Sequence, residues 1–327
     1  MFGRPITIAG LVCILAIGQG CSRKPTPAEL SKLNRELLQA VDHHDVPSVR
    51  RLLAKGADIE TTGDNNTTPL EIAAGNGDLP MTQLLWQKGA NAHIKGHSLG
   101  RLLTRAAYGG QTEIVRFLLK QNPDLTAKNE ALLEATHGEP AIVIMPDSGK
   151  SPSGAAASRE QIMAKFEDPW VETVKLLLDS GADIEATDQY QGPPLIDAAG
   201  YAQTNVVSLL LSRGANLQAR DKRGNTALIA ASCECALATM NDAYDVVKVL
   251  LEKGSDANAH ANDGTTALMN AAGGFGGSAI VKLLLEHGAD PRARDDNGKT
   301  ALKYAIEANR EDKVRLLKQA LARTRKR

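Results

Sequence analysis

Two short stretches of the chain have residue types that could bind a phosphate or a metal ion. Residues 149–151, the sequence GKS, resemble the end of a phosphate-binding loop, but Ile144 stands where the first glycine of that motif belongs and no strand-loop-helix frame surrounds it. His93 and His97 have the spacing of metal ligands, yet they lie in a turn that contains Gly96, so no helical face brings both rings together. Neither stretch predicts a nucleotide or metal site.

Cys233 and Cys235 form the third stretch with possible chemistry. A Cys-x-Cys pair can close only a small, strained disulfide, and two thiolates supply half of a zinc site. We expect two small, buried or half-buried residues at the end of a helix. A redox-sensitive disulfide is the alternative, and two free thiols in protein purified without reductant would exclude it.

Catalytic patterns are not found elsewhere in the sequence. No Ser or Cys has the context of a nucleophile elbow, and no two carboxylates are placed by the sequence in a dry pocket. The sequence therefore predicts a protein that is not an enzyme, with no catalytic residue, no metal and no cofactor.

The elements that would position a site come from a repeat. Alignment on the residue that follows each leucine-rich run gives positions 33, 33, 59, 33, 40 and 34 residues apart, and a period near 33 is typical of a stacked repeat. The aligned residues are Gly56, Gly89, Asn122, Gly181, Gly214, Gly254 and Gly288. Because glycine adopts the left-handed conformation without steric cost and asparagine tolerates it, we expect each of them to end a helix.

Each unit contains two helical patterns. In the second pattern, Val281, Leu284 and Leu285 recur at helical spacing and form an apolar face that a neighbouring unit must cover. Pairs of alanines keep the first helix slim, so that adjacent units can approach. They are Ala73-Ala74, Ala106-Ala107, Ala198-Ala199, Ala230-Ala231 and Ala271-Ala272. A Thr-Pro-Leu or Thr-Ala-Leu opens four of the first helices, with the Thr hydroxyl as N-cap and Pro69 in the first turn.

The repeated motif resembles that of the ankyrin-repeat family. It stands here as TTPLEIAAGNGD, GPPLIDAAGYAQ, NTALIAAS, TTALMNAAG and KTALKYAIEANR, each followed by a leucine-rich helix. The resemblance covers about eight units over residues 31–320, and the first and last are more polar, as terminal caps are. It implies an all-α fold, a solenoid of helix-turn-helix units with an insertion in the fourth, and we place this domain at residues 31–327.

The chain departs from the family pattern in its motifs and in its spacing. Members often have His after the Leu of the opening motif, so the hydrogen bonds of that His between loops are in doubt here. The residues at this position are Glu71, Ile196, Ile229, Met269 and Lys303. The third unit also lacks the Thr-Pro. Insertions lie at about residues 137–168, where Pro, Gly and Ser predict a mobile loop, and at about 233–242.

The first twenty residues follow the pattern of a secretory signal. One Arg precedes an apolar run from Ile6 to Ile17, which is too short to span a bilayer, and small residues lead to Cys21. This ending resembles a bacterial lipoprotein signal, although Gly18 stands where that motif prefers Leu. We expect a signal peptide at 1–20, a lipid on Cys21 and a polar tether at 21–30. Cleavage with release, and an uncleaved anchor, are the alternatives.

Charge and composition limit the kinds of partner. The 38 basic residues balance the 38 acidic ones, and aromatic residues make up 3% of the chain, so neither a basic surface nor stacking platforms for bases are expected. We expect no nucleic acid partner, and membrane contact only through the lipid on Cys21. In the Gram-negative version of the lipoprotein motif, Ser22 rather than Asp after the Cys implies sorting to the outer membrane. We expect a lipid-anchored protein of the periplasm or outer membrane, with a soluble periplasmic protein as the alternative.

In the family, the concave face of first helices and turn tips typically binds other proteins, so the resemblance implies a protein partner of unknown identity here. Tyr190 is the strongest single candidate, with packing against the insertion as its alternative role. The candidate tip residues are Asp64, Asn65, Asn66, Gln189, Tyr190, Gln191, Lys222, Arg223, Asn262, Asp263, Asp296 and Asn297. We expect a non-catalytic interaction module of the bacterial cell envelope. A protective or inhibitory protein that binds one enzyme or toxin one-to-one is the alternative.

Overall fold

The computed structural model describes residues 25–63, 66–90, 97–137, 168–187, 192–233, 240–274 and 278–324. These residues are helical, apart from connecting turns and an isolated bridge between His260 and Thr266. The all-α prediction is therefore confirmed. The chain forms two compact units, residues 1–69 and residues 70–327.

The first unit is built from one helix pair, α1 (Pro27–Asp42) and α2 (Val46–Ala54). Thr26 begins α1 with a capping box, because its hydroxyl accepts from the Glu29 N–H at 3.3 Å and the Glu29 carboxylate accepts from the Thr26 N–H at 2.7 Å. The helix thus starts inside residues 21–30, which we expected to form a tether. Leu37 and Val41 of α1 are buried, as are apolar residues of α2.

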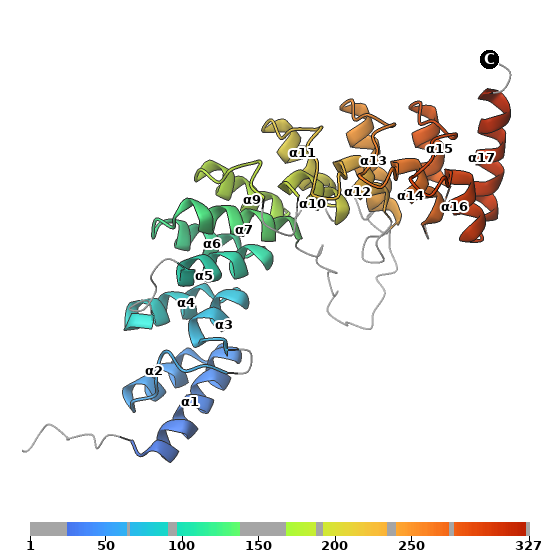
Figure 1. Cartoon of the computed structure of the whole chain (residues 1–327). Helices are drawn as coiled ribbons and strands as arrows, with labels where there is room; N and C mark the ends of the chain where they lie inside the picture. Colours follow the sequence, from blue (N-terminus) through green and yellow to red (C-terminus); the bar gives the residue numbers. More distant parts are fainter. Residues whose placement is uncertain are drawn as a thin grey trace, which may run out of the picture. The chain divides into compact units, whose positions relative to one another are not determined.

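The second unit repeats the helix pair along the chain (Figure 1). The pairs are α3 (Pro69–Gly75) with α4 (Leu79–Leu85), α5 (His97–Tyr108) with α6 (Thr112–Leu119), α7 (Leu125–His137) with α9 (Pro169–Asp179), α10 (Pro194–Gly200) with α11 (Thr204–Ser212), α12 (Ala227–Ser232) with α13 (Met240–Glu252), α14 (Ala267–Gly273) with α15 (Ala279–Glu286), and α16 (Ala301–Glu307) with α17 (Glu311–Thr324). The segment η2 (Trp86–Ala90) follows α4 and is broken at Gly89, whose φ of 97° is not helical. With α1 and α2, these pairs account for the eight units expected, within the residues described.

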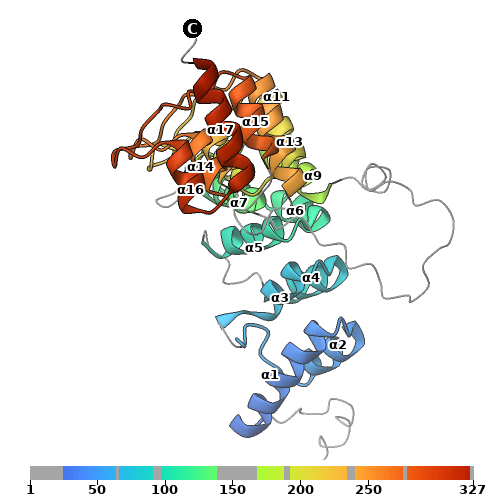
Figure 2. The ribbon, with the colours of Figure 1, turned by 90° about the vertical axis from the view of Figure 1, so that its right-hand side faces the viewer.

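The helices of the second unit form two layers. The first helices from α5 to α16 contact one another in chain order, and so do the second helices from α4 to α17. In Figures 1 and 2, α14 and α16 lie side by side in one layer and α13 and α15 in the other. The paired alanines lie between neighbouring helices and are buried, except for the partly exposed Ala230. Small side chains therefore set the close spacing of the first layer.

All seven positions that were expected to end a second helix have the left-handed conformation. Their φ angles run from 55° at Asn122 to 97° at Gly89. The Thr caps are confirmed in two units, where Thr226 accepts from the Ile229 N–H and Thr266 accepts from the Met269 N–H, while Thr300 makes no side-chain cap bond. Ala202, in the turn between α10 and α11, has a φ of 56°, a conformation that costs about 1–2 kcal/mol for a residue other than glycine.

Both insertions predicted from the spacing fall between paired helices. Residues 138–167 follow α7, and residues 233–239 separate α12 from α13. The first segment, most of the second, residues 1–24 and His93 lie outside the described residues. Among the described helices, none has the length and apolarity that a membrane span requires.

A fully buried lysine joins the last repeat to the one before it. Lys313 of α17 stands where the preceding unit has Ile280. Its ammonium donates to the carbonyl of Ala271 at 2.8 Å and to that of Gly274 at 3.1 Å. Both carbonyls lie at the C-terminal end of α14, where backbone acceptors lack helical partners and a positive charge is favourable. Lys313 thus acts as a side-chain cap supplied by a neighbouring repeat.

We expect Lys313→Met to lower the free energy of unfolding by about 2 kcal/mol, because it removes the donor from two buried carbonyls. Urea unfolding followed by circular dichroism would measure the change. Lys318→Met on the same helix is the control, since Lys318 is exposed and its replacement should change stability by less than about 0.5 kcal/mol. Equal stability of the two variants would contradict the capping role of Lys313.

Candidate partner-binding surface

The turns that lead into α12, α14 and α16 share one conformation, set by an aspartate in two of them. Asp221 accepts from the N–H groups of Arg223 and Asn225, both at 2.8 Å. Asp295 accepts in the same way from Asn297 at 3.0 Å and from Lys299 at 2.7 Å. Such bonds from a short side chain to nearby backbone N–H groups fix a tight turn.

The middle turn has Ala261 at the position of these aspartates, and Asp263 takes over part of their role. The Asp263 carboxylate accepts from the Thr265 N–H at 2.9 Å, and this bond lowers the pKa of Asp263 below its ordinary value. Asp295 of the last turn also accepts from the hydroxyl of Tyr304, on α16, at 2.7 Å. That hydrogen bond lowers the pKa of Asp295 and raises the pKa of Tyr304 to about 12.

Backbone hydrogen bonds join the tips of these three turns. The Asn262 N–H donates to the Arg223 carbonyl at 2.8 Å, and the Asp296 N–H donates to the Asp263 carbonyl at 2.9 Å. We call residues 222–224, 262–264 and 296–298 the tip row; the turns that carry it extend side by side in Figure 2. Close approach requires glycine here, because a Cβ on Gly264 would lie 2.9 Å from the Asp295 Cα. The tip row is therefore a rigid surface.

The tip row contains the six candidate residues of these turns, Lys222, Arg223, Asn262, Asp263, Asp296 and Asn297, and all six are exposed. Two of the six also have structural roles: the Asn262 amide donates to the Lys222 carbonyl at 2.9 Å, and Asp263 accepts a hydrogen bond that shapes its own turn. Asn66 is exposed in the first unit, with a φ of 61°. Asp64, Asn65, Gln189, Tyr190, Gln191 and Cys21 lie outside the described residues.

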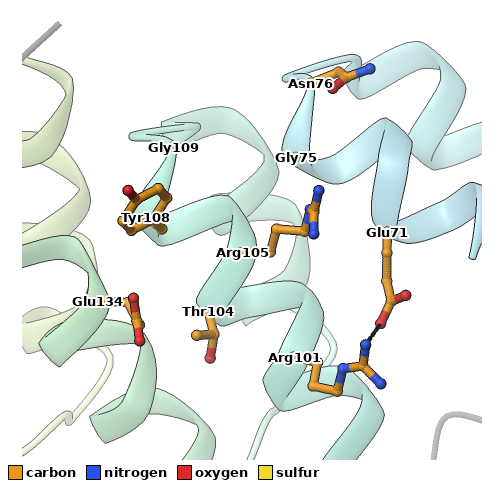
Figure 3. Close-up of a pocket in the computed structure, with 9 residues that line it drawn as sticks. All are labelled: Glu71, Gly75, Asn76, Arg101, Thr104, Arg105, Tyr108, Gly109 and Glu134. Carbon is orange, nitrogen blue, oxygen red and sulfur yellow. Dashed lines mark ion pairs between the residues drawn. The ribbon is translucent and has the colours of Figure 1, made fainter. Parts of the chain in front are cut away.

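A second feature of the surface is a groove on the first-helix layer, with a volume of about 670 Å³ (Figure 3). Its lining comes from α3, α5 and α7 and the turns after α3 and α5. The lining residues are Glu71, Gly75, Asn76, Arg101, Thr104, Arg105, Tyr108, Gly109 and Glu134. Arg101 of α5 pairs with Glu71 of α3 at 3.1 Å, and the Tyr108 side chain is half exposed. We call this feature the first-helix groove.

None of the candidate residues from the sequence lies in the first-helix groove. Two signals in the sequence could have indicated it. Tyr108 occupies a position where three other units have glycine, at Gly75, Gly200 and Gly273, and a large aromatic side chain at such a position covers the end of a slim helix. Arg105 directly precedes a buried alanine pair, where helical geometry directs a side chain toward the exposed side of the first helix.

An ion-pair cluster lies next to the groove, at the end of α7. His137 Nε2 is 3.5 Å from the Asp197 carboxylate of α10, and Nδ1 is 3.8 Å from the Glu134 carboxylate. The imidazole also meets the Tyr201 ring edge to face, with centroids 5.2 Å apart. Burial by itself would lower the pKa of His137, but the two carboxylates outweigh it and raise the pKa to about 9. At neutral pH, a charged His137 therefore links α7 to α10.

Metal and thiol chemistry have little support in the structure. No cluster of three or more His, Cys, Asp or Glu side chains suited to a metal occurs among the residues that the structure describes. Cys233 follows α12 directly, as predicted, but it is exposed rather than buried or half-buried. The short α12 ends at Ser232, so Cys233 lies outside the alanine-lined contact between the first helices. Cys235 is outside the described residues.

Stacked helix pairs, slim first helices and joined turn tips define a helical repeat protein. Comparison of sequences gives the family: the profile described as "Ankyrin repeats (3 copies)" matches residues 37–129, 161–237 and 235–325. The chain belongs to the ankyrin-repeat family. Ankyrin repeats are modules for protein–protein interaction, and proteins built from them are generally non-catalytic scaffolds.

The curated relatives share parts of the chain. A transient receptor potential cation channel subfamily A member 1 homolog of Caenorhabditis elegans is 34% identical over 131 residues, which are 40% of this chain and 9% of the channel. Ankyrin repeat and SAM domain-containing protein 6 of Rattus norvegicus is 39% identical over 74 residues, 22% of this chain and 8% of that protein. A putative ankyrin repeat protein of Rickettsia felis is 36% identical over 56 residues, 17% of this chain and 89% of that protein.

This chain spans less than a tenth of the length of the channel homolog and of the SAM-domain protein. The similarity to these two therefore concerns a small part of each protein.

The charge on His137 predicts a pH dependence of stability. Its pKa is about 9 when folded and about 6.5 when unfolded, so its contribution is complete below pH 6.5 and is lost as the pH rises through 9. Between pH 6.5 and 9.5, we expect the melting temperature of His137→Gln to fall less than that of the wild type, because the variant lacks the contribution of the charged imidazole. His260→Gln, at an exposed histidine, is the control and should keep the wild-type slope. If the melting temperature of His137→Gln depends on pH as steeply as that of the wild type, His137 is not the source of this pH dependence.

Proposed function

We propose that this protein is a non-catalytic interaction module of the bacterial cell envelope, which binds a partner protein through the tip row and the adjoining first-helix layer. The observation that carries the proposal is the tip row itself. Three successive turns are joined by backbone hydrogen bonds, while the six candidate side chains at their tips are exposed.

The tip row suits recognition of another protein for two reasons. Its backbone is already fixed, so little loop entropy is lost when a partner docks. Its exposed charges also differ along the row, with Lys222 and Arg223 on one turn and Asp263 and Asp296 on the next two. A surface that changes sign in this way favours a partner with complementary charges in the same order.

The envelope location is supported by the pattern of the first 21 residues. The apolar run from Ile6 to Ile17 and the small residues before Cys21 have the order of a lipoprotein signal. We propose that Cys21 carries a lipid and that the repeats face the periplasm or lie at the outer membrane. A soluble periplasmic protein is the alternative.

Charge reversal on the tip row tests the partner-binding proposal. Arg223→Glu combined with Asp296→Lys changes two exposed side chains and keeps the backbone bonds of both residues. We expect a protein that is captured from solubilised envelope fractions by the wild type, and then purified, to bind this variant at least about tenfold more weakly.

The matched control is Lys248→Glu combined with Glu252→Lys, which reverses two charges on the second helix α13. It should bind like the wild type. Equal affinity of the purified partner for all three proteins would exclude the tip row, and a wild type that binds no protein directly would remove the proposal.

Replacement of Cys21 tests the lipid. After expression in a Gram-negative bacterium, we expect the wild type in the membrane fraction and labelled by a clickable palmitate analogue. Cys21→Ala should be unlabelled and lose this membrane attachment, because the thiol that accepts the lipid is gone. Cys233→Ala is the control and should behave like the wild type. An unlabelled, soluble wild type would instead indicate the soluble periplasmic alternative.

A further inference from the structure

We propose that the first-helix groove binds an acidic peptide segment of the partner protein, with the Arg105 guanidinium holding an Asp or Glu carboxylate and the Tyr108 ring packing against a neighbouring apolar side chain. This inference rests on the proposed function, since it names the chemistry of the partner. It concerns a part of the surface that the tip row does not include.

The pairing of charges in the groove leaves one arginine available for a negative ligand. Glu71 is paired with Arg101 at 3.1 Å, and Glu134 is 3.8 Å from the charged His137. The Arg105 guanidinium, in contrast, makes no hydrogen bond or ion pair with any described residue. Of the charged side chains that line the groove, Arg105 is thus the one without an ion-pair partner among the described residues.

The Arg105 side chain lies close to the end of α3. In Figure 3 its side chain extends from α5 toward the end of α3, where Gly75 lies. A Cβ added to Gly75 would be 2.5 Å from the Arg105 Nε, so the absence of a side chain at residue 75 makes room for the guanidinium. The planar group therefore lies beside the end of α3, with its donors available to a ligand.

Arg105 and Tyr108 are three residues apart on α5 and so share one face of the helix. A guanidinium matches a carboxylate with two parallel N–H···O bonds, and a half-exposed tyrosine offers an apolar ring with a polar end. A carboxylate side chain beside an apolar one, on an extended peptide, satisfies both groups. Arginine and tyrosine are also the residue types that most often dominate the energy of an interface.

Selection from a peptide library tests the proposal without a known partner. The purified chain from Ser22 onward is immobilised and panned against a displayed library of random dodecapeptides. We expect the enriched sequences to contain Asp or Glu next to an apolar or aromatic residue. Their synthetic counterparts should bind the wild type, and a peptide with Glu replaced by Gln should bind at least about tenfold more weakly.

Variants of the chain then locate the contact. Arg105→Gln should weaken binding of the acidic peptide at least about tenfold. If Arg105 pairs directly with the Glu of the peptide, this variant should bind the Glu and Gln forms of the peptide with equal affinity. Gly75→Ala keeps the charge of Arg105 but displaces its guanidinium, so it should weaken binding as well. Arg315→Gln is the matched control, because Arg315 is an exposed arginine on α17. Circular dichroism spectra would verify that the variants fold.

Three outcomes would overturn the proposal: no enrichment over a protein-free support, enriched sequences without acidic residues, or binding that Arg105→Gln leaves unchanged. Each is distinct from failure of the proposed function. A partner whose binding depends on the tip row, but not on Arg105, would refute the acidic-peptide site and leave the interaction module standing. The absence of any direct protein partner would refute the module itself.

Discussion

The structure depends on one packing constraint: a single helix pair cannot bury its own apolar face. Val281 and Leu284 of α15 are fully buried only because helices from neighbouring repeats lie against them. The contact is close because paired alanines keep the first helices slim, and the chain returns to the next pair through residues in the left-handed conformation. Both the tip row and the first-helix groove result from this stacking, since each is formed by residues of successive repeats.

The fold could be predicted from the sequence because its determinants are local and recur. Gly254 and Gly288 stand where a helix ends, and Thr226 and Thr266 stand where a helix begins. Because every repeat has the same helix ends, the same residue types return at the same spacing. The start of α1 at Pro27 and the buried Lys313 were missed. In the first case, a local capping box outweighed the tether-like composition. In the second, the partners of Lys313 are 39 and 42 residues away in the sequence.

The candidate surface was predicted in outline, and its chemistry was not. Alignment of the repeats gave the positions of the tips, but not the bond from Asn262 to the Lys222 carbonyl, which joins residues 40 apart. Arg105 was missed for a related reason. Its importance comes from the space that Gly75 leaves beside its guanidinium and from the pairing of Glu71 with Arg101. Both features depend on how two repeats lie against each other. Sequence periodicity specifies which residues are exposed, whereas tertiary contacts decide which exposed groups are already paired.

This distinction explains how a repeat protein can carry a specific surface on a generic stack. In the first-helix layer, several charged side chains are already paired. Glu134 pairs with His137 within α7. Glu71 pairs with Arg101, and Asp197 with His137, across neighbouring helices. These pairs stabilise the contact between repeats and are unavailable to a partner without loss of that stabilisation. A surface charge that is left unpaired costs the stack little and is available for binding. Because stability in such stacks is the sum of nearest-neighbour terms, a change of that charge alters recognition while the remaining contacts are kept.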